Sequence, residues 1–490
     1  MELVSPETVV ADPNNPRKTD PARLELVRLS LEKFGFLLPL YATKAGVILS
    51  GHQRAVAARQ LGWQLPVVFR QKDERDAHGV NLTFNRATND FRLTDTDHSR
   101  LPIEDLFFRL QDLPDAPDPY PCLTMEQWSV GELLSRNVDR FERYAANAAR
   151  QLAAYNVQMP IVITPGGDVL NGIGRLQEAS ARRQDMIDCV VLKPDQDAEL
   201  ARFTLNKLSM DFSFSDGFKD VLRNNAFRRA RQRRRSLGSG YLFAFGVKRC
   251  RDFSIGKHRK ELRALYGERL LDFGAGQGDE ARILRKIGVK VTTFEPYRAS
   301  GKKPTVTAGR RSAFRFLKAV SQQLPFSSVM LSSVLNSVPF ETDRAHVVTI
   351  CAALCSPDTT LFAAARSRKD PNWKECSTGI GLGETSSRSA RFVLSDEPGL
   401  AVSELNADPK IQKYFQPSEF EALFERHFGA VTIGEHINNV TAVCQHPHPV
   451  NPARLRKALE FEFDLPYADG RMGLVEEALA AFSKRLGVAL

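Results

Sequence analysis

The stretch Leu270-Leu271-Asp272-Phe273-Gly274-Ala275-Gly276-Gln277-Gly278 runs from an apolar segment into a turn that contains three glycines. A helical segment, Asp279 to Ile287, follows and ends at Gly288. A second apolar segment, Val289 to Phe294, leads into Glu295, 21 residues beyond the first glycine of the turn. Glycines let a backbone approach a ligand where a Cβ atom would clash, and a carboxylate after the second strand can accept hydrogen bonds from ribose hydroxyls. The order of these segments predicts a nucleoside-binding βαβ unit.

The glycine spacing and the charge of the next helix distinguish between possible ligands. Dinucleotide-binding turns usually carry G-x-G-x-x-G, and their helix N-terminus binds a pyrophosphate. Here the pattern is G-x-G-x-G, and the helix begins with Asp279 and Glu280. Two carboxylates at this position repel a pyrophosphate but tolerate a cationic sulfonium. The alternative reading is an ordinary strand-turn-helix connection.

This pattern resembles motif I of the class I S-adenosylmethionine (SAM)-dependent methyltransferases. The resemblance implies a Rossmann-like α/β fold with SAM as cofactor. The cofactor-binding residues that it implies are Asp272, Gly274, Gly276, Gly278 and Glu295.

The segments after Glu295 continue the alternation of helix and strand. We expect a helix from about Arg311 to Gln323, a strand through Ser328 to Leu331, a helix from about Asp343 to Cys355 and a strand from Thr360 to Ala365. Such an alternation predicts a parallel sheet with helices on both faces and with ligands at the C-terminal ends of the strands.

Asn336 is the candidate catalytic residue, because it follows the predicted fourth strand. Amino-methylating DNA enzymes place an acidic or amide residue there, with two prolines and an aromatic, so that oxygen atoms accept hydrogen bonds from an exocyclic amine. The segment Asn336-Ser337-Val338-Pro339-Phe340 has the amide, one proline and an aromatic residue at a different spacing. Cytosine C5 methylation needs a nucleophilic cysteine. The only Pro-Cys pair, at Cys122, lies outside this domain, so we disfavour that reaction.

Length and composition predict a cytoplasmic protein of two to four domains. The chain has 490 residues and a formal net charge of +10, which favours a polyanionic partner. No uncharged run approaches the length of a membrane span, so we expect no membrane association. The seven cysteines form no C-x-x-C pair, which argues against a structural zinc site, and we expect no metal.

The first half of the chain contains an internal repeat with an offset of 121 residues. Leu38 to Thr43 corresponds to Met159 to Thr164, and Gly51-His52-Gln53-Arg54 corresponds to Gly172-Ile173-Gly174-Arg175. Each copy is expected to form a strand, a glycine turn, a short strand that ends in Gly-x-x-Arg, and a helix. At this junction a guanidinium and the free N–H groups of a helix N-terminus converge, which suits a phosphate.

The repeat resembles the ParB/sulfiredoxin-like domain of chromosome-partition proteins, whose Asn-Pro-Arg box is similar to Asn15-Pro16-Arg17. The Gly-x-x-Arg segment of that family contacts nucleotide phosphates, and the resemblance implies a nucleoside triphosphate at the first copy. The residues implicated are Arg17, Gly51, His52, Gln53 and Arg54, and in the second copy Arg175. The second copy lacks the polar pair between glycine and arginine, so it is the weaker candidate. The alternative in both copies is a glycine turn with an arginine packed on a surface.

A basic segment follows the repeat and reads as an interdomain connection. Six arginines in eight residues are candidates for nucleic-acid contact, and they are Arg228, Arg229, Arg231, Arg233, Arg234 and Arg235. An arginine fork matches phosphate oxygens, and a run of arginines releases several counterions at once. The alternative is a solvated linker.

Two later segments, Glu384 to Arg388 and Ile411 to Phe420, resemble the DNA-phosphorothioation-associated methyltransferases of prokaryotic DNA-modification clusters. We expect Arg388, Lys413 and Tyr414 to offer hydrogen bonds and a stacking face to a nucleotide.

The predicted organisation is two small α+β ParB-like domains (1–98 and a degenerate copy at 99–215), a basic hinge (216–245), a class I methyltransferase domain (246–450) and a C-terminal helical tail (451–490). The predicted function is SAM-dependent methylation of nucleic acid, DNA above all, in a prokaryotic or phage modification system. The rival is a nucleotide-responsive DNA-binding regulator that uses the methyltransferase fold as a cofactor sensor. Partners that both readings allow are DNA, a second copy of the chain and other modification-system proteins.

Overall fold

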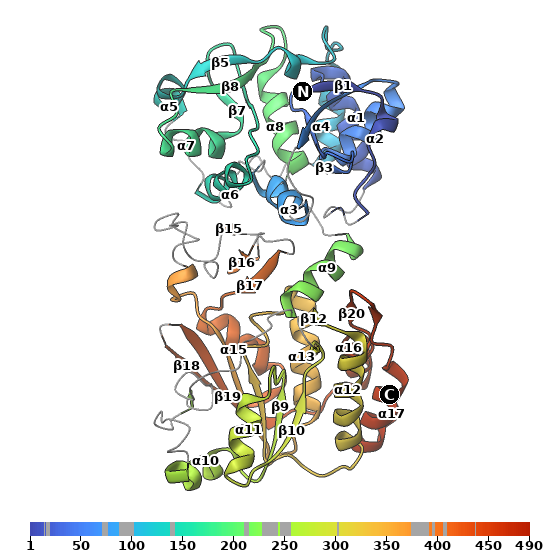
Figure 1. Cartoon of the computed structure of the whole chain (residues 1–490), viewed down its shortest axis with the longest axis vertical. Coiled ribbons are helices and arrows are strands. Elements are labelled where there is room, and N and C mark those ends of the chain that lie inside the picture. The colour runs from blue at the N-terminus through green and yellow to red at the C-terminus, as the bar shows by residue number, and fades with distance from the viewer. Residues whose placement is uncertain are drawn as a thin grey trace. The chain divides into compact units, whose positions relative to one another are not determined.

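The computed structural model describes residues 1–13, 15, 20–70, 77–87, 102–137, 143–209, 215–227, 244–245, 256–300, 303–373, 392–393, 397–404, 409–436 and 438–490. These residues belong to two compact units (Figure 1). The first comprises Met1–Val221, Glu375–Glu397 and Val402–Lys410, and the second comprises Leu222–Lys374, Pro398–Ala401 and Ile411–Leu490. No helix among the described residues has the length and apolar character to cross a membrane.

The first unit contains two four-stranded sheets of the same topology. One has the order β1-β4-β2-β3 and the other the order β5-β8-β6-β7. β1 pairs antiparallel with β4, β4 pairs parallel with β2, and β2 pairs antiparallel with β3. The second sheet repeats these directions in the pairs β5–β8, β8–β6 and β6–β7. The strands are β1 (Glu2–Val4), β2 (Leu40–Thr43), β3 (Ile48–Ser50), β4 (Leu65–Arg70), β5 (Glu126–Ser129), β6 (Ile161–Ile163), β7 (Val169–Asn171) and β8 (Met186–Val191).

The two sheets also share their irregularities at the 121-residue offset. The register shifts between Tyr41 and Ala42 in one sheet, and between Val162 and Ile163 in the other. Helix α2 (His52–Leu61) begins after Gly51 with φ 98°, and helix α7 (Ile173–Ala181) begins after Gly172 with φ 114°. The duplication in the sequence is therefore matched by a duplication in backbone structure.

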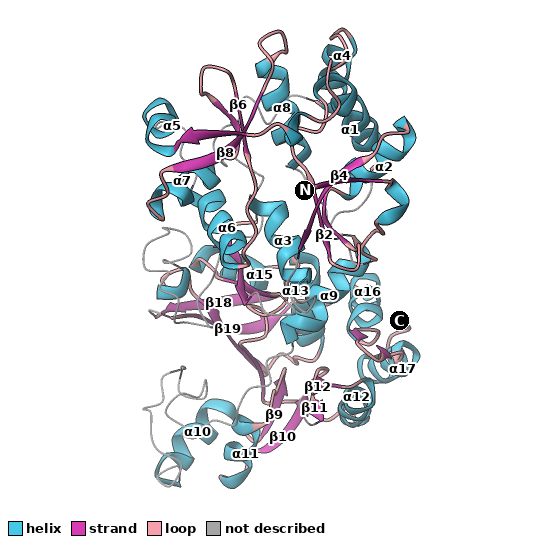
Figure 2. Ribbon diagram, turned by 45° about the horizontal axis from the view of Figure 1, so that its top comes forward, coloured by secondary structure: helices cyan, strands magenta, loops and turns pink. Residues whose placement is uncertain are grey.

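Further helices pack against these sheets and against one another (Figure 2). They are α1 (Pro21–Phe34), α3 (Ala77–Ala87), α4 (Ile103–Gln111), α5 (Val130–Asn137), α6 (Arg143–Ala154) and α8 (Ala198–Ser209). Helix α1 begins where the Asp20 side chain accepts a hydrogen bond from the Ala22 N–H, and it buries Val27, Leu31 and Phe34 against α2 and α4. Helix α9 (Asp216–Phe227) follows α8 in the chain.

The second unit is built on a six-stranded sheet of order β10-β9-β13-β14-β19-β18. The first four strands are parallel, and β19 runs antiparallel to both of its neighbours, so β18 has the same direction as the first four. This arrangement confirms the predicted Rossmann-like fold, while the antiparallel strand was not predicted. The strands are β9 (Arg269–Phe273), β10 (Lys290–Phe294), β13 (Ser328–Ser332), β14 (Thr360–Arg366), β18 (Phe428–Glu435) and β19 (Asn439–Pro447).

Alternate residues of the central strands point to two different apolar cores. Leu271, Val329 and Leu361 belong to the larger core, which includes residues of α12 (Val306–Val320) and α13 (Glu341–Ala353). Their chain neighbours Leu270, Met330 and Phe362 belong to a smaller core with α10 (Arg259–Tyr266) and α11 (Asp279–Lys286). Because side chains along a strand alternate between faces, the parallel strands are apolar on both.

The C-terminal tail belongs to the larger core. Helices α16 (Pro452–Glu462) and α17 (Val475–Leu486) pack on α13 and α12. The ring of Phe463 stacks on Phe294, at a centroid distance of 5.6 Å. The Tyr467 hydroxyl donates to the Pro296 carbonyl oxygen at 2.5 Å. The residues after 450 therefore cover the strand that ends at the predicted cofactor carboxylate.

The remaining elements of the C-terminal half are short. They are β11 (Ala299–Ser300), β12 (Lys303–Pro304), β15 (Phe392–Val393), β16 (Leu400–Glu404), β17 (Lys410–Lys413), α15 (Pro417–Glu425), β20 (Pro466–Tyr467) and β21 (Gly470–Arg471).

We predict that Gly309→Ala lowers the free energy of unfolding. A Cβ atom at this position in α12 would lie 2.1 Å from the Tyr467 Oη and 2.6 Å from the Pro296 oxygen. Overpacking of this kind costs roughly 1–3 kcal/mol, which outweighs the gain of about 0.5–1 kcal/mol that alanine normally brings to a helix. Urea unfolding followed by circular dichroism measures the change.

Gly131→Ala in α5 is the matched control, because the nearest atom to its new Cβ would be 3.8 Å away. It should leave stability unchanged or raise it. An equal effect of both substitutions would contradict the steric explanation.

Candidate cofactor and acceptor site

The glycine turn lies over the C-terminal ends of β9 and β10. Gly274, Gly276 and Gly278 have φ angles of 79°, 54° and 72°, which favour glycine. The N–H groups of Gly274 and Ala275 both donate to the Phe294 carbonyl oxygen, at 2.8 and 2.9 Å. A Cβ atom on Gly278 would have no neighbour within 4 Å, so this side of the turn is open.

Glu295 is joined to this turn by its side chain. Its Oε2 accepts from the Gly276 N–H at 2.7 Å, and its Oε1 accepts from the Tyr297 N–H at 3.1 Å. Its own N–H donates to the Ser312 Oγ in α12 at 3.1 Å. Each carboxylate oxygen can accept a further hydrogen bond, such as one from a ribose hydroxyl. Ser312 was not predicted, because a serine inside a helix 17 residues away gives no local signal.

Asp272 is buried in β9, between Thr293 of β10 and Met330 of β13. Asp279 begins α11 as expected, and its Oδ1 lies 3.9 Å from the Arg282 Nη2. A helix that begins with carboxylates disfavours a pyrophosphate at its N-terminus.

The segment after β13 brings Asn336 to the same edge of the sheet. A Cβ atom on Gly274 would lie 2.2 Å from the Val334 Cγ2, so this segment touches the glycine turn. Strand β13 ends at Ser332, and Asn336 therefore lies four residues into the loop instead of at the strand end. Only 1% of Asn336 is exposed, and its backbone oxygen accepts from the Lys413 N–H at 2.8 Å.

Two buried polar atoms here have no hydrogen-bond partner in the part of the chain that the structure describes. They are the Asn336 Oδ1 and the Ser332 Oγ. An unsatisfied buried acceptor costs free energy and needs an explanation. A ligand that donates to Asn336 would supply one.

The predicted nucleotide contacts of Lys413 and Tyr414 are corrected by their burial. Lys413 is 4% exposed, donates from Nζ to the Pro398 carbonyl oxygen, and lies 3.7 Å from Glu419. Tyr414 is 3% exposed, and its ring packs on Trp373 at a centroid distance of 5.5 Å. Both side chains are used to pack the segment after β17, so neither offers a free face.

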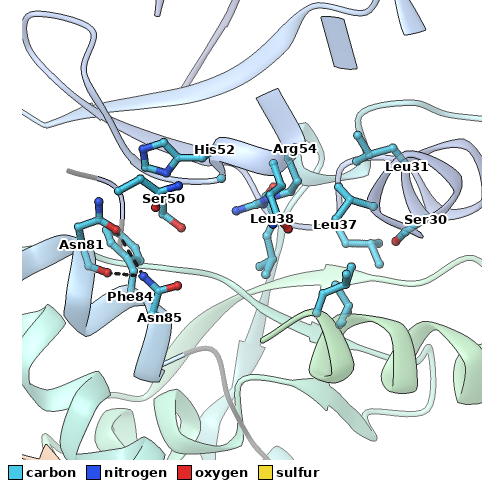
Figure 3. Close-up of a pocket in the computed structure, with 17 residues that line it drawn as sticks. Ser30, Leu31, Leu37, Leu38, Ser50, His52, Arg54, Asn81, Phe84 and Asn85 are labelled. Carbon is cyan, nitrogen blue, oxygen red and sulfur yellow. Dashed lines mark hydrogen bonds between the residues drawn. The ribbon is translucent and has the colours of Figure 1, made fainter. Parts of the chain in front are cut away.

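The first unit contains a cavity of about 140 Å³ at the Gly-x-x-Arg segment of the first copy (Figure 3). Its wall is partly apolar and partly polar. The polar and glycine residues that line it are Asn15, Ser30, Gly35, Ser50, Gly51, His52, Gln53, Arg54, Asn81 and Asn85.

His52 and Arg54 both have partners within the first copy. Burial lowers the pKa of His52 to about 4, so its ring is neutral at pH 7, and its Nε2 accepts from the Asp12 N–H at 3.3 Å. Arg54 donates from Nη1 to the carbonyl oxygens of Leu38 and Pro39. Burial lowers its pKa to about 10, which leaves it charged at pH 7. Arg54 thus fixes the backbone that leads into β2, and its side chain also lines the cavity.

In the second copy Arg175 also lines a cavity, of about 240 Å³, and its guanidinium is bonded to other groups of the same copy. Arg175 is buried and donates to the Pro160 oxygen at 2.6 Å and to the Asn171 Oδ1 at 2.5 Å. Asn171 in turn donates to Asn206 at 3.0 Å. These bonds engage the guanidinium of Arg175, and its role as a phosphate ligand stays a prediction.

Other predicted contacts lie outside the described residues. They are Arg17, Arg228, Arg229, Arg231, Arg233, Arg234, Arg235 and Arg388. Among the residues that are described, no group of three or more His, Cys, Asp or Glu side chains could hold a metal ion.

A glycine turn and an acid at neighbouring strand ends, in a sheet of this order, define the class I methyltransferase architecture. The model of the family described as a methyltransferase domain matches residues 230–430. Residues 230–430 therefore match a methyltransferase domain, in agreement with the predicted enzyme class.

Several solved structures are similar to this chain. The 1,6-didemethyltoxoflavin-N1-methyltransferase of Burkholderia thailandensis is 16% identical, with 40% of this chain and 79% of that chain covered and a TM-score of 0.24. A SAM-dependent methyltransferase of Bacteroides fragilis is 12% identical, with 46% and 95% covered and a TM-score of 0.25. One from Clostridium acetobutylicum is 10% identical, with 42% and 95% covered and a TM-score of 0.27. No curated protein matches the chain.

The residues at the glycine turn fit SAM. The open side of Gly278 leaves room for the donor, and the Glu295 carboxylate is oriented by two backbone N–H groups. An acidic helix start tolerates the sulfonium charge.

We predict that Glu295→Ala weakens binding of S-adenosylhomocysteine, because it removes the acceptor for the ribose hydroxyls and releases the Gly276 N–H. The loss should be roughly 1–3 kcal/mol. Titration calorimetry measures it.

Glu268→Ala is the control, since the Glu268 side chain is exposed and pairs only with Arg263 among the ion pairs of the described chain. It should bind the ligand as the parent does. If Glu295→Ala binds S-adenosylhomocysteine as tightly as the parent, this carboxylate does not contact the cofactor.

Proposed function

We propose that the methyl acceptor is an exocyclic amine of a nucleic-acid base, in DNA of a prokaryotic or phage modification system. The observation that carries the proposal is the buried Asn336 Oδ1, which has no hydrogen-bond partner among the described residues and lies in the segment that touches the glycine turn. An amine with two N–H bonds can donate one to this oxygen while its nitrogen lone pair faces the donor. An ionised carboxylate has no hydrogen to donate to the same group.

The catalytic task of this chain is mainly alignment. SAM supplies a methyl group on a sulfonium that is already a good leaving group. The glycine turn and Glu295 hold the donor, and Asn336 orients the acceptor nitrogen. Correct orientation of two reactants can supply several kcal/mol of a barrier, about 7–11 in well-aligned model systems. The site therefore needs no catalytic triad.

A polymeric acceptor is supported by the charge of the chain. The formal net charge is +10. A basic protein attracts a polyanion and holds it while one base is presented. A base inside a duplex is poorly reachable, so the acceptor base would leave the stack.

The rival is a DNA-binding regulator that binds the cofactor as a signal. The same glycine turn and Glu295 suit a sensor, and the missing second proline after Asn336 favours it. The two functions differ in one observable, which is transfer of label to nucleic acid.

We predict that the protein transfers a tritiated methyl group to DNA and that Asn336→Ala abolishes the transfer. Removal of the amide takes away the acceptor that orients the amine, whereas the glycine turn stays intact. Label is measured in a panel of DNA and RNA substrates, and nucleoside mass spectrometry locates it.

Cofactor affinity of Asn336→Ala serves as the control for folding and should equal that of the parent. Tight cofactor binding with no label in any nucleic acid would favour the sensor.

We also propose that the first ParB-like copy binds a nucleoside triphosphate, and that the second does not. Support comes from the polar residues that line the cavity at Gly51 to Arg54. In the second copy the equivalent arginine lines a cavity too, but it also donates to Asn171. His52 and Gln53 contribute polar groups to the cavity where the second copy has Ile173 and Gly174.

We predict that His52→Ile combined with Gln53→Gly, which gives the first copy the residues of the second, abolishes triphosphate binding measured by equilibrium dialysis. Arg175→Ala should leave binding unchanged, provided that circular dichroism shows a folded protein. Unchanged binding in the double variant would overturn this proposal.

A further inference from the structure

One face of helix α12 gathers basic side chains around an exposed aromatic ring. Arg310, Arg311, Arg315 and Lys318 are all exposed, and Phe314 lies among them with 47% of its surface accessible. Phe314 follows Arg310 by four residues, Arg315 follows Arg311 by four and Lys318 follows Arg315 by three, intervals that place side chains along one side of a helix. We call these five residues the basic stripe.

The charge of the stripe is not compensated within its own helix. The sequence of α12 contains no acidic residue. None of the four cations makes an ion pair with any described residue, and the acidic residues Glu476 and Glu477 at the start of the neighbouring α17 also lack ion pairs within this described set. Within the described residues, the stripe is therefore a cluster of cations without ion pairs, although the Asp469 carboxylate accepts from the Val306 N–H at the start of the same helix.

The stripe begins beside the cofactor site. Ser312, on the inner side of the same helix, accepts from the Glu295 N–H at 3.1 Å. Gly309, one turn earlier, lies against Pro296 and Tyr467 without room for a Cβ atom. This close packing fixes α12 against the strand end that carries Glu295. Figures 1 and 2 show α12 beside α17.

An exposed phenylalanine among cations has a specific chemical use. A protein usually buries such a ring, because its transfer from water is favourable. Proteins that bind single strands combine basic side chains, which follow the phosphates, with aromatic rings on which bases stack. From Arg311 to Lys318 the helix rises about 10 Å, which lets the cations reach more than one phosphate.

We infer that the basic stripe is a binding track for single-stranded nucleic acid, with a base stacked on Phe314 and phosphates paired with Arg311, Arg315 and Lys318. This inference rests on the proposed function, and it identifies the form in which the acceptor polymer meets the methyltransferase unit. A duplex keeps its bases stacked on one another, so it can use the cations but not the ring.

The test measures binding of a fluorescent single-stranded oligonucleotide by anisotropy, with the full chain and without cofactor. Arg311, Arg315 and Lys318 are changed together to Gln. The logarithm of affinity falls with the logarithm of salt by about 0.7 per single-strand phosphate contact, so the slope should decrease by up to about 2. A second variant, Phe314→Ala, should weaken binding about fivefold or more, without a change in salt slope.

The charge-matched control lies in the same unit. Arg454, Arg456 and Lys457 are exposed on α16, and Arg456 pairs with Glu460 at 2.9 Å. Their triple change to Gln removes the same charge and should leave both affinity and slope nearly unchanged. If the two triple variants lose affinity and salt slope equally, the stripe acts only through the net charge of the protein, and the inference is overturned.

Two further outcomes separate the inference from its alternatives. Phe314→Ala should not affect binding of inorganic polyphosphate, which has no base to stack. If Phe314→Ala binds the oligonucleotide as the parent does, or if the triple variant loses only binding to anionic lipid vesicles, the track is not a nucleic-acid site. Stripe-dependent binding without methyl transfer to any nucleic acid would sustain the inference and defeat the proposed function.

Discussion

The absence of a Cβ atom at Gly274 is the constraint on which the cofactor site depends. At this position the chain turns with positive φ, and the N–H groups of Gly274 and Ala275 both donate to the Phe294 oxygen. Val334 fills the space that a side chain on Gly274 would need. Three segments separated by up to 60 residues thus meet at the Cα of Gly274, which carries a hydrogen atom where other residues carry a Cβ. Any larger residue at position 274 would push the segment from Val334 to Asn336 away from the glycine turn.

The larger apolar core transmits this constraint to the rest of the unit. Phe294, which accepts the hydrogen bonds of the turn, is buried between Phe273, Phe316 and Phe463. Residues from the tail therefore stabilise the strand that positions Glu295. Tyr467 adds a hydrogen bond to Pro296, directly after that carboxylate. The tail therefore contributes to the stability of the methyltransferase unit, and its loss would expose β10, the strand that leads to Glu295.

The two copies in the first unit show how one backbone supports two different polar interiors. Both carry an arginine that donates to carbonyl oxygens of the strand entry, at Leu38 and Pro39 in one copy and at Pro160 in the other. In the second copy Asn171 receives a further bond from Arg175, whereas the first copy has Ser50 at the equivalent place. A cavity lies beside the arginine in both copies. A change of one side chain from asparagine to serine removes a side-chain partner of the guanidinium, while its bonds to backbone oxygens remain. The arginine is thus first a structural residue, and its use for a ligand depends on what surrounds it.

The sequence by itself determined the order of elements in the methyltransferase unit, because glycine spacing, an acid after the second strand and apolar runs are local properties of a chain. It also predicted the repeat, since matching residues at a constant offset imply matching backbones. Tertiary structure alone decided which polar side chains remain accessible. Lys413 and Tyr414 have the composition of a nucleotide contact, yet packing against Pro398 and Trp373 buries them. Ser312 has no local signature, yet it anchors Glu295 because α12 crosses over the end of β10. Burial depends on contacts between residues far apart in the chain, and no local pattern of charge or apolarity contains that information.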